Sequence, residues 1–256
     1  MNIYFTGMGM VGTELAKRGY NYLDCDILDK KQIAKSLRGA NDEKDILVHT
    51  AALTNVDECE RDPQKALFVN VRGTSNLLDL WWGKFLYIST DHVFSGRHFF
   101  KYREFHTPNP VNRYGITKLA GETIVLYGNN KVVRTSKLFN RDFVVGELEQ
   151  LPKFFTAAMK RSFLHVEHFV NGLEWMFENW NKCPNILNVA SNNVMSHYQF
   201  FNKAADQLGY DMNLVRRRNE KLKNATPRPM RGGLDPWNAE HLGVPIYSTR
   251  DGIDLL

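Results

Sequence analysis

The amino-acid sequence predicts an α/β fold, with a doubly wound parallel sheet and a small C-terminal lobe. Three observations predict it. Short apolar runs alternate with amphipathic segments through the first half of the chain, a glycine-rich turn follows the first run, and the alternation loosens after about Phe139. Parallel strands need helical crossovers between them, so this order of elements gives a sheet with helices on both faces.

The first half of the chain supplies the elements of this sheet. Strands are predicted where short runs rich in Ile, Val, Tyr and Phe occur, and helices where apolar residues recur with a period near 3.6. The predicted strands are residues 2–6, 20–24, 46–49, 84–89 and 131–134, and the predicted helices are 11–18, 31–37, 63–80 and 113–127.

The second half has a looser pattern. Helices are predicted over residues 154–159, 169–180 and 199–208, and one further strand over 185–189. The tail from Asn224 onward contains four prolines and is predicted to be mostly irregular. The dense basic run Arg216-Arg217-Arg218 is interpreted as a solvated loop, with no nucleic-acid-binding motif around it.

Composition bounds the class of protein. The 256 residues include 43% hydrophobic and 24% charged residues, which is ordinary for a globular chain with a real core. No run approaches the ~20 apolar residues of a membrane span, and the N-terminus lacks the pattern of a signal peptide. The three cysteines show no metal-binding spacing, so we expect reduced thiols, no metal and a cytoplasmic location. The net charge of +5 permits a phosphate-bearing ligand.

The first chemical motif is the glycine-rich turn Gly7-Met8-Gly9-Met10-Val11-Gly12, between the first strand and the first helix. Glycines at this spacing let the backbone approach a pyrophosphate, and the helix N-terminus supplies N–H donors. The motif predicts a Rossmann-like dinucleotide-binding domain. Asp24 and Asp26 follow at the distance expected of the acid that binds the adenosine ribose, which favours NAD over NADP.

The second motif is Tyr114-x-x-x-Lys118, whose spacing places both side chains on one helix face. An ammonium beside the phenol is expected to lower the tyrosine pKa toward neutrality and make the phenol a proton donor. A second match, Tyr127 to Lys131, encloses Gly-Asn-Asn, which should end the helix and separate the two side chains.

The third motif is Ser89-Thr90-Asp91, at the end of a strand rich in β-formers. Open α/β sheets bind ligands at the carboxyl ends of their strands, so these polar groups are candidates for substrate contact. The alternative interpretation is a helix cap or turn made by the same residues.

Together these motifs resemble the dTDP-4-dehydrorhamnose reductase family of extended short-chain dehydrogenases/reductases. The resemblance also rests on the segments "HTAALTNVDECERDPQKALFVNVRGTSNL", "STDHVFSG", "NPVNRYGITKLAGE", "VVRTSKLF" and "RPMRGGLD". It implies that the chain uses NADH or NADPH to reduce a 4-keto-6-deoxyhexose carried on a nucleotide diphosphate. It further implies a dinucleotide-binding domain over residues 1–140 and a small substrate-binding lobe over 141–256, packed partly back on the first.

The resemblance also assigns roles to residues. The implied catalytic residues are Thr90, Tyr114 and Lys118. Those implied to bind cofactor are Gly7, Gly9, Met10, Val11, Gly12, Asp26, Ile27, Ala51, Ala52, Tyr114 and Lys118. Those implied to bind substrate are Thr90, Asp91, Val93, Phe94, Lys137, Arg228 and Arg231, the two arginines facing the diphosphate.

Four features depart from the family pattern. The glycine turn is one residue shorter than the usual GxxGxxG, and the second strand is short. Lys137 stands where the family commonly has Trp against the sugar, and the stretch between Phe139 and "SFLHVEHF" is shorter than usual. We therefore expect a sugar or nucleotide that differs from the thymidine-linked rhamnose precursor.

Two other functions fit the sequence. One is a nucleotide-sugar epimerase or dehydratase on the same fold, against which stands His92, where a Glu would be expected after Asp91. The other is a non-catalytic NAD(P)-binding regulatory subunit, which the shortened lobe and Lys137 favour and the intact catalytic motifs oppose. Nucleic acid and membrane are not expected partners, whereas a homodimer is a candidate assembly.

Overall fold

The computed structural model describes residues 1–41, 43–127, 130–218 and 225–256. Its centre is a six-stranded sheet in which every neighbouring pair is parallel. In spatial order the strands are β10 (Ile186–Asn188), β5 (Lys131–Thr135), β4 (Lys84–Thr90), β3 (Ile46–His49), β1 (Ile3–Thr6) and β2 (Asn21–Leu23). The predicted α/β class with a doubly wound parallel sheet is confirmed.

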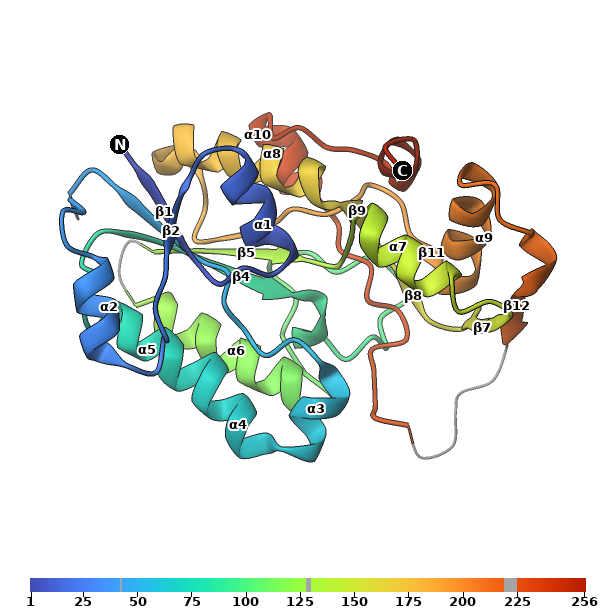
Figure 1. Cartoon of the computed structure of the whole chain (residues 1–256), viewed down its shortest axis with the longest axis horizontal. Coiled ribbons are helices and arrows are strands. Elements are labelled where there is room, and N and C mark those ends of the chain that lie inside the picture. Colours follow the sequence, from blue (N-terminus) through green and yellow to red (C-terminus); the bar gives the residue numbers. More distant parts are fainter. Residues whose placement is uncertain (42, 128–129, 219–224) are drawn as a thin grey trace.

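Helices cover both faces of this sheet (Figure 1). One face carries α1 (Met10–Lys17), α8 (Val166–Glu178) and α10 (Trp237–Leu242), whose apolar residues form one core with β1 and β3. The other face carries α2 (Lys30–Ser36), α5 (Gly73–Leu78) and α6 (Arg113–Val125), packed around Leu47, Phe85 and Tyr87. Strands buried on both faces explain the nearly continuous apolar runs of the sequence.

The predicted helix over 63–80 is one continuous helix that contains a single π-helical turn. It consists of α4 (Pro63–Leu67), the π-helical turn η1 (Phe68–Arg72) and α5. The π turn directs Asn70 inward, where its amide bonds the backbone of Leu53 and the hydroxyl of Thr117. A separate short helix, α3 (Val56–Arg61), precedes it and was not predicted.

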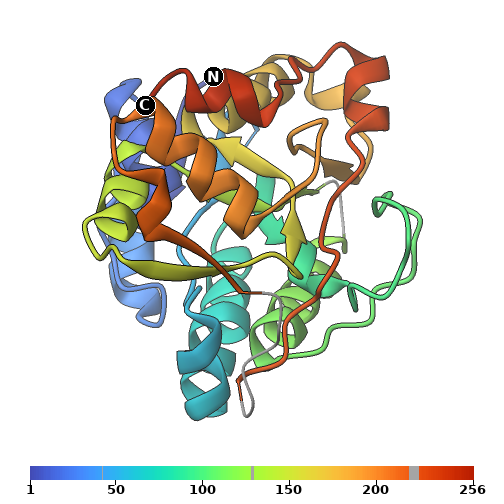
Figure 2. The same ribbon diagram turned by 90° about the vertical axis from the view of Figure 1, so that its right-hand side faces the viewer.

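The remaining elements form a smaller lobe at the carboxyl edge of the sheet (Figures 1 and 2). Its apolar centre is built on stacked phenylalanines, with Phe200 on Phe163 and Phe201 on Phe155. Its strands pair two by two, β12 with β7, β11 with β8 and β6 with β9. The elements are β6 (Lys137–Phe139), α7 (Arg141–Leu148), β7 (Lys153–Thr156), β8 (Lys160–Arg161), β9 (Phe163–His165), β11 (Met195–Ser196), α9 (His197–Gln207), β12 (Val215–Arg218) and α11 (Thr249–Ile253).

Two predictions for this half were wrong, and a third was confirmed. Residues 154–159 do not form a helix, because Lys153–Thr156 is strand β7, whose partner β12 lies 62 residues further along the chain (215 − 153). The basic run Arg216–Arg218 belongs to that partner strand and not to a loop. The tail is mostly irregular, as predicted, with two short helices, α10 and α11, inside it; its predicted start at Asn224 lies outside the described residues.

The two halves of the chain share the central sheet. β10, from the second half, pairs with β5 along Ile186↔Val132 to Asn188↔Arg134. Short 3-10 turns complete the fold, namely η2 (Asp91–Val93), η3 (Trp180–Lys182) and η4 (Met212–Leu214). Within the described residues, no helix has both the length and the apolar character that crossing a membrane requires.

Candidate active site

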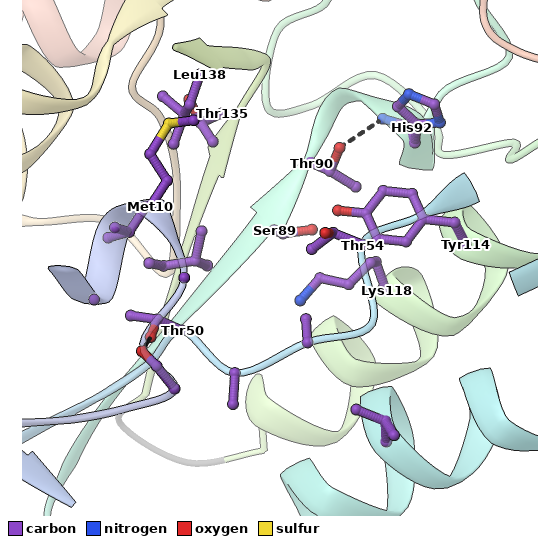
Figure 3. A pocket seen from close by; sticks show the side chains of 18 of the residues that line it. Met10, Thr50, Thr54, Ser89, Thr90, His92, Tyr114, Lys118, Thr135 and Leu138 are labelled. Atoms are coloured by element: carbon purple, nitrogen blue, oxygen red, sulfur yellow. Dashed lines mark hydrogen bonds between the residues drawn. The ribbon is translucent and has the colours of Figure 1, made fainter. Parts of the chain in front are cut away.

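A cavity of about 680 Å³ lies over the carboxyl ends of β1, β3, β4 and β5. The glycine turn forms one wall, the end of β4 and the start of α6 form the floor, and β6 with Arg161 closes the far side. This is the edge where parallel α/β sheets bind ligands. Figure 3 shows the side chains that converge there.

The glycine turn has the backbone geometry that its sequence predicts. Gly7 adopts a positive φ of 77° and packs on the backbone of Ala51. A Cβ on Gly12 would overlap the carbonyl oxygen of Gly7, so this position admits only glycine. A Cβ on Gly9, in contrast, would meet nothing within 4 Å. The turn therefore leaves open space above Gly9, where a pyrophosphate would approach.

Every residue assigned to the cofactor by resemblance lines this cavity. Asp26 lies just beyond β2, where its carboxylate accepts the backbone N–H of Leu28 at 2.8 Å. Ile27 packs beneath the same wall against Gly73, whose missing side chain makes room for it. The remaining members of the set are Gly7, Gly9, Met10, Val11, Gly12, Ala51 and Ala52, together with Tyr114 and Lys118.

Thr90, Tyr114 and Lys118 meet on the cavity floor. Thr90 ends β4, while Tyr114 and Lys118 lie one turn apart on α6, which Asn112 caps through a 2.8 Å bond from the Gly115 N–H. In Figure 3 the Tyr114 hydroxyl points toward Thr90. The Lys118 Nζ lies 3.9 Å from the ring centre of Tyr87. The structure thus brings Thr90, which precedes Tyr114 by 24 residues, to the two side chains on α6.

The pKa values of these groups differ from the expected pattern. Burial raises the pKa of Tyr114, and the hydrogen bond with Thr90 opposes this only in part. Burial also lowers the pKa of Lys118 to about 7. The expected lowering of the Tyr114 pKa is therefore wrong for this structure, because loss of hydration outweighs any help from an ammonium that is itself desolvated. Tyr114 keeps its proton at neutral pH.

A buried ion pair fixes α6 against the sheet beneath the site. Glu122 on α6 accepts hydrogen bonds from Arg134 of β5, at 2.9 and 2.6 Å, and from the Ser89 hydroxyl at 2.5 Å. Arg134 and Glu122 are each only 1% exposed. Since Ser89 precedes Thr90, these hydrogen bonds fix the position of the end of β4 relative to α6.

Asp91 has a partner that no motif predicted. Its carboxylate lies 3.2 Å from the Nε of Arg161, and it accepts the Ser136 hydroxyl at 2.7 Å. Arg161 comes from β8, is 3% exposed and lines the cavity. The sequence offered no signal for this contact except a basic residue before the strand "SFLHV", so Arg161 and Ser136 were missed.

Lys137 also lines the cavity, at the start of β6. Its Nζ lies 4.3 Å from the ring centre of Phe143, and burial lowers its pKa. The lysine therefore lines the same cavity as the residues assigned to the cofactor, and its assignment to the substrate stays a prediction.

Four other residues assigned to the substrate lie elsewhere. Val93 and Phe94 are fully buried in a separate apolar cluster and do not line the cavity. Arg228 pairs with Asp57 at 2.8 Å, and the Arg231 guanidinium stacks over Phe99 at 4.2 Å. Neither arginine lines the cavity.

The second Tyr-x-x-x-Lys match is not part of the site. Tyr127 is 93% exposed, and Lys131 belongs to β5. Helix α6 ends at Val125, before Tyr127, while residues 128 and 129 of the predicted helix stop lie outside the described residues. Only the first match places both side chains on one helix.

A family model described as the RmlD substrate binding domain matches residues 1–255 of this chain. The chain belongs to this family. The resemblance found in the sequence motifs is thereby confirmed over the whole length. Spore coat polysaccharide biosynthesis protein SpsK from Bacillus subtilis is 25% identical, over 96% of this chain and 92% of the relative.

Solved structures of this family show the same architecture. The dTDP-4-dehydrorhamnose reductase from Bacillus anthracis, in complex with NADP, superposes with a TM-score of 0.87 at 25% identity. The match covers 99% of this chain and 98% of that one.

Another relative is named as a subunit and not as a reductase. Methionine adenosyltransferase 2 subunit beta from Bos taurus is 30% identical over 78% of this chain. The chain spans only 65% of that relative.

Proposed function

We propose that this protein uses NADH or NADPH to reduce a keto group on a nucleotide-linked 6-deoxyhexose, in deoxysugar biosynthesis. One observation carries the proposal. A glycine turn open to a pyrophosphate and the trio Thr90, Tyr114 and Lys118 face one cavity, in a chain that matches the reductase family from end to end. The complex of the Bacillus anthracis relative with NADP supports the choice of cofactor.

The cavity fits a dinucleotide. The space above Gly9 and the N-terminus of α1 suit a pyrophosphate, and Asp26 and Ile27 form the wall that an adenosine would contact. A reduced nicotinamide, when bound, supplies the hydride for the reaction. The carboxylate of Asp26 favours NADH, because it would repel the 2′-phosphate of NADPH.

The residues of this chain orient the substrate and move a proton. Thr90 presents a hydroxyl to the carbonyl oxygen of the sugar, and Tyr114 donates its phenolic proton to the oxygen as it gains charge. The raised pKa of Tyr114 keeps this proton in place until then. Lys118, on the next turn of α6, would hold the hydroxyls of the nicotinamide ribose when the cofactor is bound. Positioning of the reactants and this proton transfer supply most of the rate that the protein itself contributes.

The environment of Asp91 argues against an epimerase or dehydratase, which needs further acid–base groups. The carboxylate is already paired with Arg161, and its neighbour His92 has a pKa lowered to about 4 by burial. His92 is therefore neutral at pH 7, and the Asp91 carboxylate is occupied by Arg161 and the Ser136 hydroxyl. The simple reductase remains the better assignment.

A non-catalytic regulatory subunit is the second candidate, favoured by the likeness to methionine adenosyltransferase 2 subunit beta. The two functions predict different results in one assay. NADH or NADPH oxidation is followed with a panel of thymidine-, uridine-, guanosine- and cytidine-linked 4-keto sugars made in situ by a dehydratase. Turnover with any member supports the reductase. Absence of turnover across the panel, with measurable cofactor binding, supports the regulatory subunit.

The proposal also assigns a ligand to each part of the chain. Residues 1–140 hold the dinucleotide, and residues 141–256 form the lobe that takes the sugar nucleotide. Three free cysteines support a cytoplasmic location. The homodimer stays a prediction, which the molar mass from light scattering tests.

A further inference from the structure

The cavity contains a positive charge that forms no ion pair with any acidic side chain in the described part of the chain. Lys137 sits at the start of β6, directly after Ser136, and lines the cavity. Its ammonium lies over the face of the Phe143 ring, 4.3 Å from the ring centre, in a cation–π contact. Its ammonium has no hydrogen-bond acceptor within the described part of the chain.

The acidic groups nearest to Lys137 already have partners. Glu147 accepts a hydrogen bond from Lys153 at 2.5 Å. Asp91 is paired with Arg161 and also accepts the Ser136 hydroxyl. The other charged groups that act on Lys137 are the cations Arg161 and Arg228. The cluster around Lys137 therefore carries an excess positive charge.

A half-buried ammonium without an anion is costly, and burial accordingly lowers the Lys137 pKa. A ligand that brings a negative charge to this place removes that cost. Arg228 and Arg231, which the sequence suggested for this role, are held at Asp57 and Phe99 and do not reach the cavity.

The position of Lys137 in the cavity indicates which negatively charged group of a substrate would reach its ammonium. Thr90 lies beside Thr135 in the sheet register, and both Thr90 and Ser136 donate hydrogen bonds to the Asp91 carboxylate. Lys137 lies two residues beyond Thr135, which at the rise of an extended chain is roughly 7 Å past the level of Thr90, comparable to the span between the two ends of a sugar ring. In a sugar nucleotide, the charged group at that separation is the phosphate attached to the sugar.

We propose that the Lys137 ammonium binds the sugar-proximal phosphate of the nucleotide diphosphate and so is a specificity-determining residue of this chain. The proposal rests on the proposed sugar-nucleotide function and names the residue that recognises its diphosphate. The proposal also explains why position 137 has a lysine where the family commonly has Trp, because the contact with the substrate would be ionic in this chain.

The test is calorimetric titration of the protein saturated with NAD⁺ or NADP⁺, whichever binds more tightly, so that the probes cannot occupy the cofactor's own pyrophosphate site. The probes are dTDP, UDP, GDP and CDP, each paired with its monophosphate. In the unmodified protein, the preferred diphosphate should bind more tightly than its monophosphate. Lys137→Met should weaken diphosphate binding about 10- to 100-fold, the usual range for loss of a charge-assisted hydrogen bond, and leave monophosphate binding nearly unchanged.

Three further variants make the result specific. Lys137→Arg should keep most of the affinity, and Lys137→Gln should behave like Lys137→Met. Lys203→Met removes the same charge from an exposed position on α9 and should change nothing. Thermal unfolding and NADPH affinity of each variant show that the fold is intact.

Two results would overturn the inference. One is a diphosphate-to-monophosphate affinity ratio that Lys137→Met does not change, as expected if a carboxylate on the sugar were the natural partner. The other is a protein that turns over a keto sugar but shows no Lys137-dependent diphosphate binding, which leaves the reductase function standing. Lys137-dependent binding without any turnover would instead reject the reductase and keep the inference.

Discussion

The phenolic proton of Tyr114 is the group on which the proposed reaction depends. Replacing Tyr114 with Phe removes the proton donor and keeps the ring, its edge contact with His92 and the packing of α6. We expect turnover to fall by ~10²- to 10⁴-fold, the usual contribution of a general acid, with cofactor affinity nearly unchanged. Steady-state kinetics and fluorescence titration with NADPH measure the two quantities.

Tyr127 provides the matched control for that experiment. It belongs to the other Tyr-x-x-x-Lys match, is 93% exposed and lies away from the cavity. Tyr127→Phe should leave turnover unchanged. Equal losses in the two variants would show that the helix-face argument is wrong.

The glycine turn separates a binding effect from a folding effect at two nearby positions. Gly9 has a φ of −73° and open space around it, so Gly9→Val should fold and yet abolish NADH and NADPH binding, because its side chain fills the pyrophosphate approach. Gly12→Val should instead unfold the protein at a much lower temperature, since the Cβ has no space. Thermal unfolding combined with cofactor titration distinguishes these outcomes. A Gly9→Val protein of unchanged cofactor affinity would refute the assignment.

Site residues that belong to a motif were predictable, and isolated ones were not. The glycine turn, Thr90 and the pair on α6 carry a spacing that reflects the geometry of a helix or strand end. Arg161 reaches Asp91 only because β8 folds back over the cavity, a contact between residues 70 positions apart. No local pattern encodes such a contact, and the same holds for the position of Arg228 at Asp57.

At the scale of elements, the buried pair of Glu122 and Arg134 holds α6 on the sheet. Glu122→Ala leaves an unpaired guanidinium that is 1% exposed, and we expect it to reduce the free energy of unfolding by about 3–5 kcal/mol. The double variant Glu122→Leu, Arg134→Met removes both charges and should lose far less. Chemical denaturation of both variants measures this difference.

Exposed Glu149 at the end of α7 serves as the control for that measurement. Glu149→Ala should change the unfolding free energy by less than about 0.5 kcal/mol. If Glu122→Ala were equally mild, the ion pair would not be what holds α6 in place.

The elements of the first half could be predicted because each strand is apolar throughout and each helix carries an amphipathic repeat. Prediction failed in the lobe, where pairing is not local. The sequence of β7, KFFT, followed by Ala157 and Ala158, suits a helix as well as a strand, and its conformation is decided by β12 far along the chain. The Arg-rich β12 has little apolar character of its own and depends on the same pairing.

For the molecule as a whole, histidines whose pKa is lowered in the folded state make stability depend on pH. Burial lowers the pKa of His49 and of His197 to about 3 and that of His92 to about 4. In the unfolded chain each titrates near 6.5, so below that pH the unfolded state binds protons that the folded state does not. The stability they contribute is complete above pH ~6.5 and is lost as the pH falls toward 4.

Denaturant midpoints between pH 7 and pH 4 check this dependence. We expect the midpoint to fall steadily over the interval, and His197→Gln to make the fall shallower by removing one of the three groups. A midpoint that stays constant from pH 7 to pH 5 would show that these histidines are protonated in the folded protein.

The position of β10 at the edge of the central sheet has a consequence for biosynthesis. As the chain leaves the ribosome, β1 to β5 are complete before any of residues 141–185 have been made, yet Ile186–Asn188 is the strand that covers β5. Until then one edge of the nascent sheet offers unpaired backbone groups, the kind of surface that recruits chaperones or another chain. Translation speed through the lobe therefore sets how long that edge stays open.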